Sequence, residues 1–189
     1  MKKLRRLRKD ILLSAIILAA VLLVVQGTKF QTVDEYYRTH IDDITSDTPT
    51  VTISILCGTL LDKYDSLPPE LQDEKYVPRD GVILPPTKVR LRDGDSVFDV
   101  LNRITREKRI QFDYQDASLG IYDSAYVRGI NFLYEYTCGP LSGWTYTVNG
   151  NHPDYGCSRY ILCPNDDIKW QYTCDLGRDV GFIIEEDKK

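Results

Sequence analysis

The sequence has few of the residues and motifs on which catalytic and metal sites usually depend. It contains only two histidines, and no two of its five cysteines form a Cys-x-x-Cys pair. It also has no Gly-x-Ser-x-Gly turn, no glycine-rich phosphate loop and no loop with the spacing of a calcium-binding hand. These absences argue against a zinc site, a serine hydrolase and a nucleotide-dependent enzyme. We therefore expect a protein that is not an enzyme and has no resident metal or cofactor.

Three pairs of acidic residues come nearest to a metal or catalytic site. Paired carboxylates serve both as calcium ligands and as acid–base pairs. Turns and helix caps, however, explain the first two of these pairs equally well. The pairs are Asp93 with Asp95, Asp166 with Asp167, and Asp175 with Asp179.

Positive charge is scarce beyond the start of the chain. The first ten residues hold six of the 24 basic side chains and a single acid, Asp10. The remainder carries 18 basic and 27 acidic residues, a net charge of −9 within a total of −4. An acidic domain is poorly suited to nucleic acid or to anionic membrane surfaces, so we expect no nucleic-acid partner.

The basic head is followed by an apolar run from Ile11 to Val25, interrupted only by Ser14. Fifteen helical residues rise about 22 Å, less than a ~30 Å hydrocarbon core, which favours a cleaved signal peptide. Lys9 and Lys29, however, can extend the span by snorkelling, so we favour an uncleaved anchor instead. The positive charge of the head places it in the cytoplasm. The expected parts are a cytoplasmic head (1–10), a single-pass anchor in the cell membrane (11–27), an acidic spacer (28–49) and an extracytoplasmic domain (50–189).

One amphipathic helix is predicted after the Asp93-Gly94-Asp95 turn. Ser96 is a good N-cap, and Asp99 stands at the position of the second capping-box residue. Apolar residues then recur at the spacing of one helix face. These residues are Val97, Val100, Leu101 and Ile104.

The rest of the domain is rich in predicted strands. Alternation predicts a strand over 51–55, a surface loop over 58–80, and short strands at 82–84, 88–92, 110–114 and within 126–136. We expect an α+β fold, a mostly antiparallel sheet with one packed amphipathic helix, in a β-grasp-like layout.

The segment from Gly139 to Asp179 contains both tryptophans and the clearest alternation. Trp144, Tyr146 and Val148 share one face of a predicted strand that ends at the turn dipeptide Asn149-Gly150. A second hairpin is predicted from 158–162 and 167–174, with Ile168, Trp170 and Tyr172 on one face.

Four runs in this half of the chain resemble the transcobalamin-like C-terminal domain, which in bacteria is a domain of unknown function. They are GDSVFDVL from Gly94, SGWTYTVNG from Ser142, NHPDYGCSRYIL from Asn151 and DDIKWQYTCDLGRDVG from Asp166. The resemblance extends from about Val82. The transcobalamin-like domain is similar to the small β domain that closes over the corrin ring in intrinsic factor and transcobalamin. The resemblance implies a binding module with a cobalamin-like ligand, which the predicted anchor would hold at the membrane.

The cysteines are expected to be partly oxidised outside the cell. With Asn165 and Asp166 as the central turn residues, Cys157 stands opposite Cys174 at a separation that suits a disulfide. Cys57 with Cys138 is the second choice, and a state with all five cysteines reduced remains open.

Aromatic rings are the main candidates for ligand contact, because flat rings can lie against a planar ligand. The alternative is that tryptophan and tyrosine alternating on a strand belong to the core. The alternative function is a cell-envelope interaction or structural module that binds a protein or glycan. The predicted ligand-binding residues are Trp144, Tyr146, Asn149, Tyr155, Trp170 and Tyr172, with Tyr160 beside them.

Overall fold

The computed structural model describes residues 45, 47–119 and 123–182. The described residues belong to one compact unit, Asp43–Lys189. The predicted head and anchor, and the spacer as far as residue 44, lie outside these residues. Within them, no helix has the length and apolar character needed to cross a membrane.

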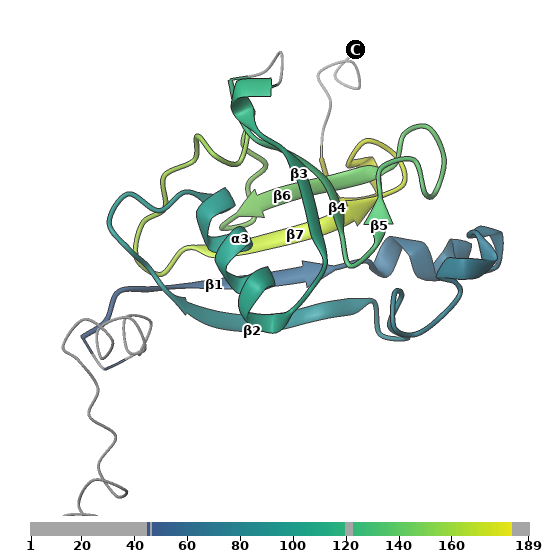
Figure 1. Cartoon of the computed structure of the whole chain (residues 1–189), viewed down its shortest axis with the longest axis horizontal. Helices are drawn as coiled ribbons and strands as arrows, with labels where there is room; N and C mark the ends of the chain where they lie inside the picture. The colour runs from purple at the N-terminus through teal and green to yellow at the C-terminus, as the bar shows by residue number, and fades with distance from the viewer. Residues whose placement is uncertain (1–44, 46, 120–122, 183–189) are drawn as a thin grey trace, which may run out of the picture. The chain divides into compact units, whose positions relative to one another are not determined.

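The centre of the domain is a four-stranded sheet in the order β2-β1-β7-β6 (Figure 1). Its two central strands, the first and last of the fold, run parallel, and both outer pairs are antiparallel. The strands are β1 (Thr50–Leu56), β2 (Val82–Arg90), β6 (Gly143–Val148) and β7 (Asp167–Thr173).

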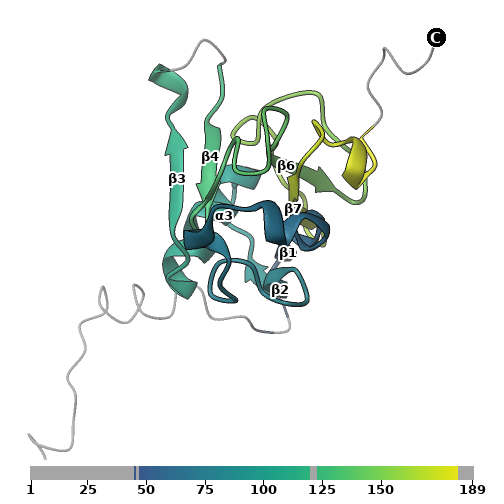
Figure 2. The same ribbon diagram turned by 90° about the vertical axis from the view of Figure 1, so that its right-hand side faces the viewer.

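A second, antiparallel sheet has the order β3-β4-β5. Figures 1 and 2 show that it crosses the large sheet on the side that also carries helix α3. Its strands are β3 (Phe112–Gln115), β4 (Tyr126–Ile130) and β5 (Leu133–Tyr134). The α+β prediction, with one helix packed on mostly antiparallel strands, is therefore confirmed for the described residues.

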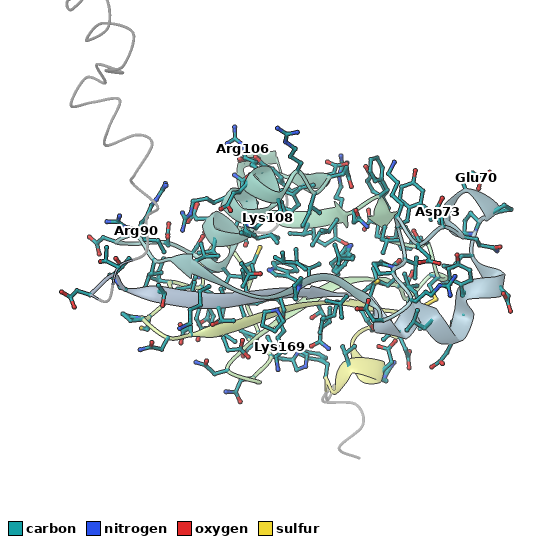
Figure 3. All side chains as sticks on the ribbon, turned by 90° about the horizontal axis from the view of Figure 1, so that it is seen from below. Glu70, Asp73, Arg90, Arg106, Lys108 and Lys169 are labelled. Atoms are coloured by element: carbon teal, nitrogen blue, oxygen red, sulfur yellow. A yellow bond between two sulfur atoms is a disulfide. The ribbon has the colours of Figure 1, made fainter. Side chains whose placement is uncertain are left out.

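Helix α3 (Val97–Lys108) begins as the sequence predicts. The Asp99 N–H donates to the Ser96 Oγ at 3.2 Å, and the Ser96 N–H donates to the Asp99 carboxylate at 2.9 Å. The predicted apolar stripe is buried in the main core against residues of β1 and β7. Arg106 lies on the outer side of the helix, while Lys169 lies on the far side of the large sheet (Figure 3).

The predicted surface loop over 58–80 is wrong in one respect, because part of it supplies core. It contains the 3₁₀ helices η1 (Gly58–Ser66) and η2 (Pro69–Leu71). Leu60, Leu67 and Val77 are buried in a second apolar cluster with Tyr172 and Leu133. Charged residues dominate the local sequence and obscure this apolar set. Two further 3₁₀ turns are η3 (Ala117–Leu119) and η4 (Arg178–Val180).

The two short strands predicted at 82–84 and 88–92 form one strand, β2, that continues through Pro85 and Pro86. Ile53 pairs with Thr87 and Ile55 with Leu84, so the two prolines form a bulge in the ladder. Proline is tolerated here because β2 is an edge strand.

The second predicted hairpin is wrong. Residues 158–162 form turns and a single bridge rather than a strand. The antiparallel partner of β7 is β6, with Trp144 opposite Tyr172 and Tyr146 opposite Trp170. The shared face of Ile168, Trp170 and Tyr172 is confirmed, since all three are buried.

The predicted disulfide between Cys157 and Cys174 depended on that hairpin. Cys174 bonds to Cys138, with the two Cα atoms 5.6 Å apart, so both the Cys157–Cys174 and the Cys57–Cys138 pairings are wrong. The physical reason is that β6, not 158–162, runs beside β7 and brings the segment before it to the end of β7. Cys57 and Cys157 are buried free thiols, and Cys163 is an exposed one.

Candidate ligand-binding groove

Two adjoining hollows lie between the start of β4, strand β6 and the loop 154–159. The narrower one, about 200 Å³, is lined by three predicted site residues: Trp144, Tyr146 and Trp170. The wider one, about 420 Å³, is lined by a fourth, Tyr155. Both are also lined by Ala125, Tyr126 and Gly156, so we treat them as one surface, the aromatic groove.

The floor of the aromatic groove is a pair of packed rings. Tyr146 and Trp170 face each other across β6 and β7, with ring centroids 5.3 Å apart and planes inclined by 31°. Trp170 is only 2% exposed, and its indole N–H has no hydrogen-bond acceptor among the described residues. A buried donor without a partner costs the folded state free energy.

Trp144 is held in a fixed orientation on the wall of the groove. Its indole N–H donates to the Leu133 carbonyl at 2.7 Å, and its ring meets Tyr172 edge to face, with centroids 5.3 Å apart. Only part of the side chain is buried. The ring therefore offers an apolar surface that needs little ordering when a ligand binds.

Two exposed tyrosines form the rim. Tyr126 and Tyr155 are each 47% exposed. The Tyr126 hydroxyl donates to Glu135 at 2.6 Å, and Tyr155 stacks on Tyr160 with centroids 5.7 Å apart. Large exposed rings beside a hollow are suited to covering a flat ligand.

The loop 154–159 is fastened to the start of β4. The Ser124 and Ser158 hydroxyls lie 2.9 Å apart, and the Ala125 N–H donates to the Ser158 Oγ at 2.9 Å. Gly156 passes so close to Ser124 that a Cβ on the glycine would overlap that side chain. The groove is therefore a preformed feature with a defined width at this point.

Burial keeps two ionisable groups at the floor of the groove, the Tyr146 phenol and the Cys157 thiol, in their neutral forms. Burial, with a smaller contribution from Cys157, raises the pKa of the Tyr146 phenol, which donates to the Tyr155 carbonyl at 2.7 Å. Burial likewise raises the pKa of the Cys157 thiol to about 12. The floor thus offers ring faces rather than charge or a nucleophile.

The remaining predicted site residues, Asn149 and Tyr172, do not line the groove. Tyr172 is fully buried in the second cluster, and its hydroxyl donates to the Tyr134 carbonyl at 2.6 Å. Asn149 adopts a positive φ of 54° and its amide group links Asp166 and Asp167. Both residues therefore support the strands from outside the groove.

The acidic pairs have structural partners. Asp95 is nearly buried and pairs with Arg103 at 2.6 Å, and Asp179 accepts the Cys174 N–H at 2.7 Å. Among the described residues no group of three or more His, Cys, Asp or Glu is placed to hold a metal ion.

Residues at the start of β4 are the part of the groove that sequence reasoning missed. Tyr126 begins the aromatic-rich segment 126–136, whose alternation predicts a strand but not its neighbours, and Ser124 and Ala125 lie just before that segment. Tyr126 is a large ring at an outward-facing strand position, and this was the one sequence signal that could have marked the start of β4 as part of a binding surface.

Comparison with known proteins gives a family match and a limited likeness of fold. A family described as a domain of unknown function (DUF4430) matches residues 94–174. The match includes the groove walls and most of the motif runs quoted above, and no curated protein matches.

Among solved structures, haptocorrin in complex with Cbi is 13% identical, with a TM-score of 0.48 over 70% of this chain. This chain covers 27% of that protein. A protein from Ruminococcus gnavus ATCC 29149, provisionally described as metal binding, is 10% identical, with a TM-score of 0.40 over 66% of this chain and 96% of that one.

Proposed function

We propose that the domain is a binding module whose aromatic groove takes a small planar molecule of the corrinoid class. The observation that carries the proposal is the set of aromatic rings that line the groove, Trp144, Tyr146 and Trp170, with the exposed Tyr126 and Tyr155 at its rim. The ligand class follows from the resemblance of the motif runs to the transcobalamin-like C-terminal domain.

The groove is open and shallow relative to a macrocycle. Its two parts, about 200 and 420 Å³, suit a ligand that lies against the rings with one edge inserted. A ligand covered on one side only gains less buried area than one enclosed between two domains. We therefore expect a dissociation constant in the micromolar range or weaker, equivalent to about −8 kcal/mol or less favourable.

The proposal places the module outside the cell, held by residues 11–27 in the cell membrane. The basic head before the apolar run supports that orientation. Protease added to intact spheroplasts would then digest the chain beyond residue 28, and protection of the domain would contradict this placement.

Calorimetric titration of the purified full-length chain in detergent with cobalamin and with cobinamide tests the ligand. Tyr155→Ala should weaken binding about tenfold while leaving the melting temperature nearly unchanged, because this rim tyrosine is 47% exposed. Phe132→Ala is the matched control, since Phe132 is similarly exposed at 43% but lines neither part of the groove.

Tryptophan fluorescence gives a second readout, because the chain has two tryptophans and both line the groove. A folded wild-type chain that shows neither heat nor a fluorescence change at millimolar corrinoid would overturn the proposed ligand.

A further inference from the structure

The outer edge of β6 has no strand beside it in the described part of the chain, since β6 is a terminal strand of the large sheet. The Asn149 N–H donates to the Asp167 carbonyl at 2.8 Å, in the same register as the β6–β7 ladder. Backbone groups alternate in direction along an antiparallel strand. Those of Thr145 and Thr147 therefore point toward β7, and those of Trp144 and Tyr146 point outward.

This outward edge is closed at both ends and open between them. At one end the Tyr136 N–H donates to the Ser142 carbonyl at 3.0 Å. At the other, Val148 and Asn151 exchange two backbone hydrogen bonds of 2.9 and 3.0 Å. The open stretch between these ends holds two outward N–H groups and two outward carbonyls, a length that matches four or five residues of an added strand.

The opposite edge of the same sheet is protected against pairing, and the β6 edge is not. The β2 edge carries Pro85 and Pro86 within a bulge, followed by Lys88, and prolines, bulges and lysines are common means of blocking an edge. The β6 sequence, GWTYTV, contains no proline and no charge, and it is rich in strand-forming residues.

The surroundings of the open edge are aromatic and acidic. Exposed Tyr126 lines the narrower part of the groove together with Thr145 and Tyr146 of β6. Tyr155, Asp123 and Asp154 line the adjoining wide part with a single base, Arg159. These charges favour a basic over an acidic segment.

We propose that the outer edge of β6 binds an extended, basic peptide segment of a partner protein as an added strand. Backbone hydrogen bonds to Trp144 and Tyr146 supply the pairing, and alternate side chains of the peptide face the rim tyrosines. This interaction surface goes beyond the small-molecule site and does not need a corrinoid to be bound.

Amide hydrogen exchange of the ¹⁵N-labelled full-length chain in detergent tests the proposal residue by residue. In the free protein the amides of Trp144 and Tyr146 should exchange at least tenfold faster than those of Thr145 and Thr147. The probe is a capped hexapeptide of alternating lysine and valine. At saturation it should slow exchange at Trp144 and Tyr146 at least tenfold and leave Thr145 and Thr147 unchanged.

The matched control is the same hexapeptide with N-methyl groups on every second residue, which keeps its charge but removes the donors of one edge. It should bind at least tenfold more weakly. Equal binding of the two peptides, no binding of the first at millimolar concentration, or slow exchange at Trp144 and Tyr146 in the free protein would each overturn the proposal.

A second copy of the chain is the competing occupant, and sedimentation distinguishes it. Protection of Trp144 and Tyr146 that rises with protein concentration, together with a doubled mass, would assign the edge to self-pairing. Corrinoid titration gives a separate answer, so failure of the small-molecule site leaves the peptide result interpretable.

Discussion

Gly156 and Ser124, far apart in the sequence, approach so closely that no side chain fits on the glycine. This contact sets the distance between the loop 154–159 and the start of β4, the two sides of the wide part of the aromatic groove. The absence of a Cβ at position 156 is therefore a requirement of packing rather than of backbone conformation.

Gly156→Ala should destabilise the domain by about 1–3 kcal/mol, because the new methyl group must displace the Ser124 side chain or the loop. Urea denaturation followed by fluorescence measures the loss. Gly58→Ala is the control, since a Cβ there meets nothing within 4 Å. A Gly156→Ala variant as stable as the control would show that the loop lies farther from β4.

Removing the disulfide by the double substitution of Cys138 and Cys174 to Ala should cost about 4 kcal/mol, the chain-entropy value for a separation of 36 residues. Cys163→Ala should leave stability unchanged, because that free thiol is exposed. Peptide mapping without reductant should give a Cys138–Cys174 link, and a Cys157–Cys174 link would contradict the β6–β7 register.

The cap and the stripe of α3 should contribute separately. Ser96→Ala should lower stability by about 0.5–2 kcal/mol through loss of the capping bond from the Asp99 N–H to the Ser96 Oγ. Leu101→Ala should cost about 2–5 kcal/mol by leaving a cavity in the main core. Arg106→Ala, on the outer side of the helix (Figure 3), should change stability by less than about 0.5 kcal/mol. Insensitivity at Leu101 would mean that the helix does not pack on the sheet.

His152 should make stability fall in mild acid. Burial lowers its pKa in the folded protein, and its ring packs on Phe182 with centroids 4.9 Å apart. The unfolded chain then takes up a proton more readily as the pH falls through about 6.5, so stability is retained above that pH and lost below it. His152→Asn should show a smaller loss between about pH 8 and 5 in urea midpoints. Equal losses in both proteins would contradict the lowered pKa.

Patterns within short stretches of sequence correctly predicted helix α3 and the buried face of strand β7. Ser96, Asp99 and the apolar stripe are close in sequence, so α3 was predicted with its cap, and the alternation around Trp170 gave the buried face of β7. These signals require no knowledge of which segments meet in space.

The wrong predictions concern pairing between distant segments. Cys174 was assigned to Cys157 because a turn at Asn165 offered a short-range hairpin. Strand β6 takes that place after a longer connection, and Cys138 arrives with it. The same limit explains why only part of the groove was predicted. Trp144, Tyr146 and Trp170 lie on adjacent strands with clear alternation, whereas Tyr126 reaches them only because the small sheet crosses the large one.

The parallel pairing of β1 with β7 also has a consequence for biosynthesis. The ribosome releases β1 well before β7, yet Ile53 lies beside Ile168 in the finished sheet. Until β7 emerges, the nascent chain holds an apolar strand with one edge uncovered, a state prone to aggregation. Such non-local pairing also slows folding. The large sheet therefore cannot be completed until β7 has left the ribosome, and a chain that stops short of Asp167 would depend on chaperones to remain soluble.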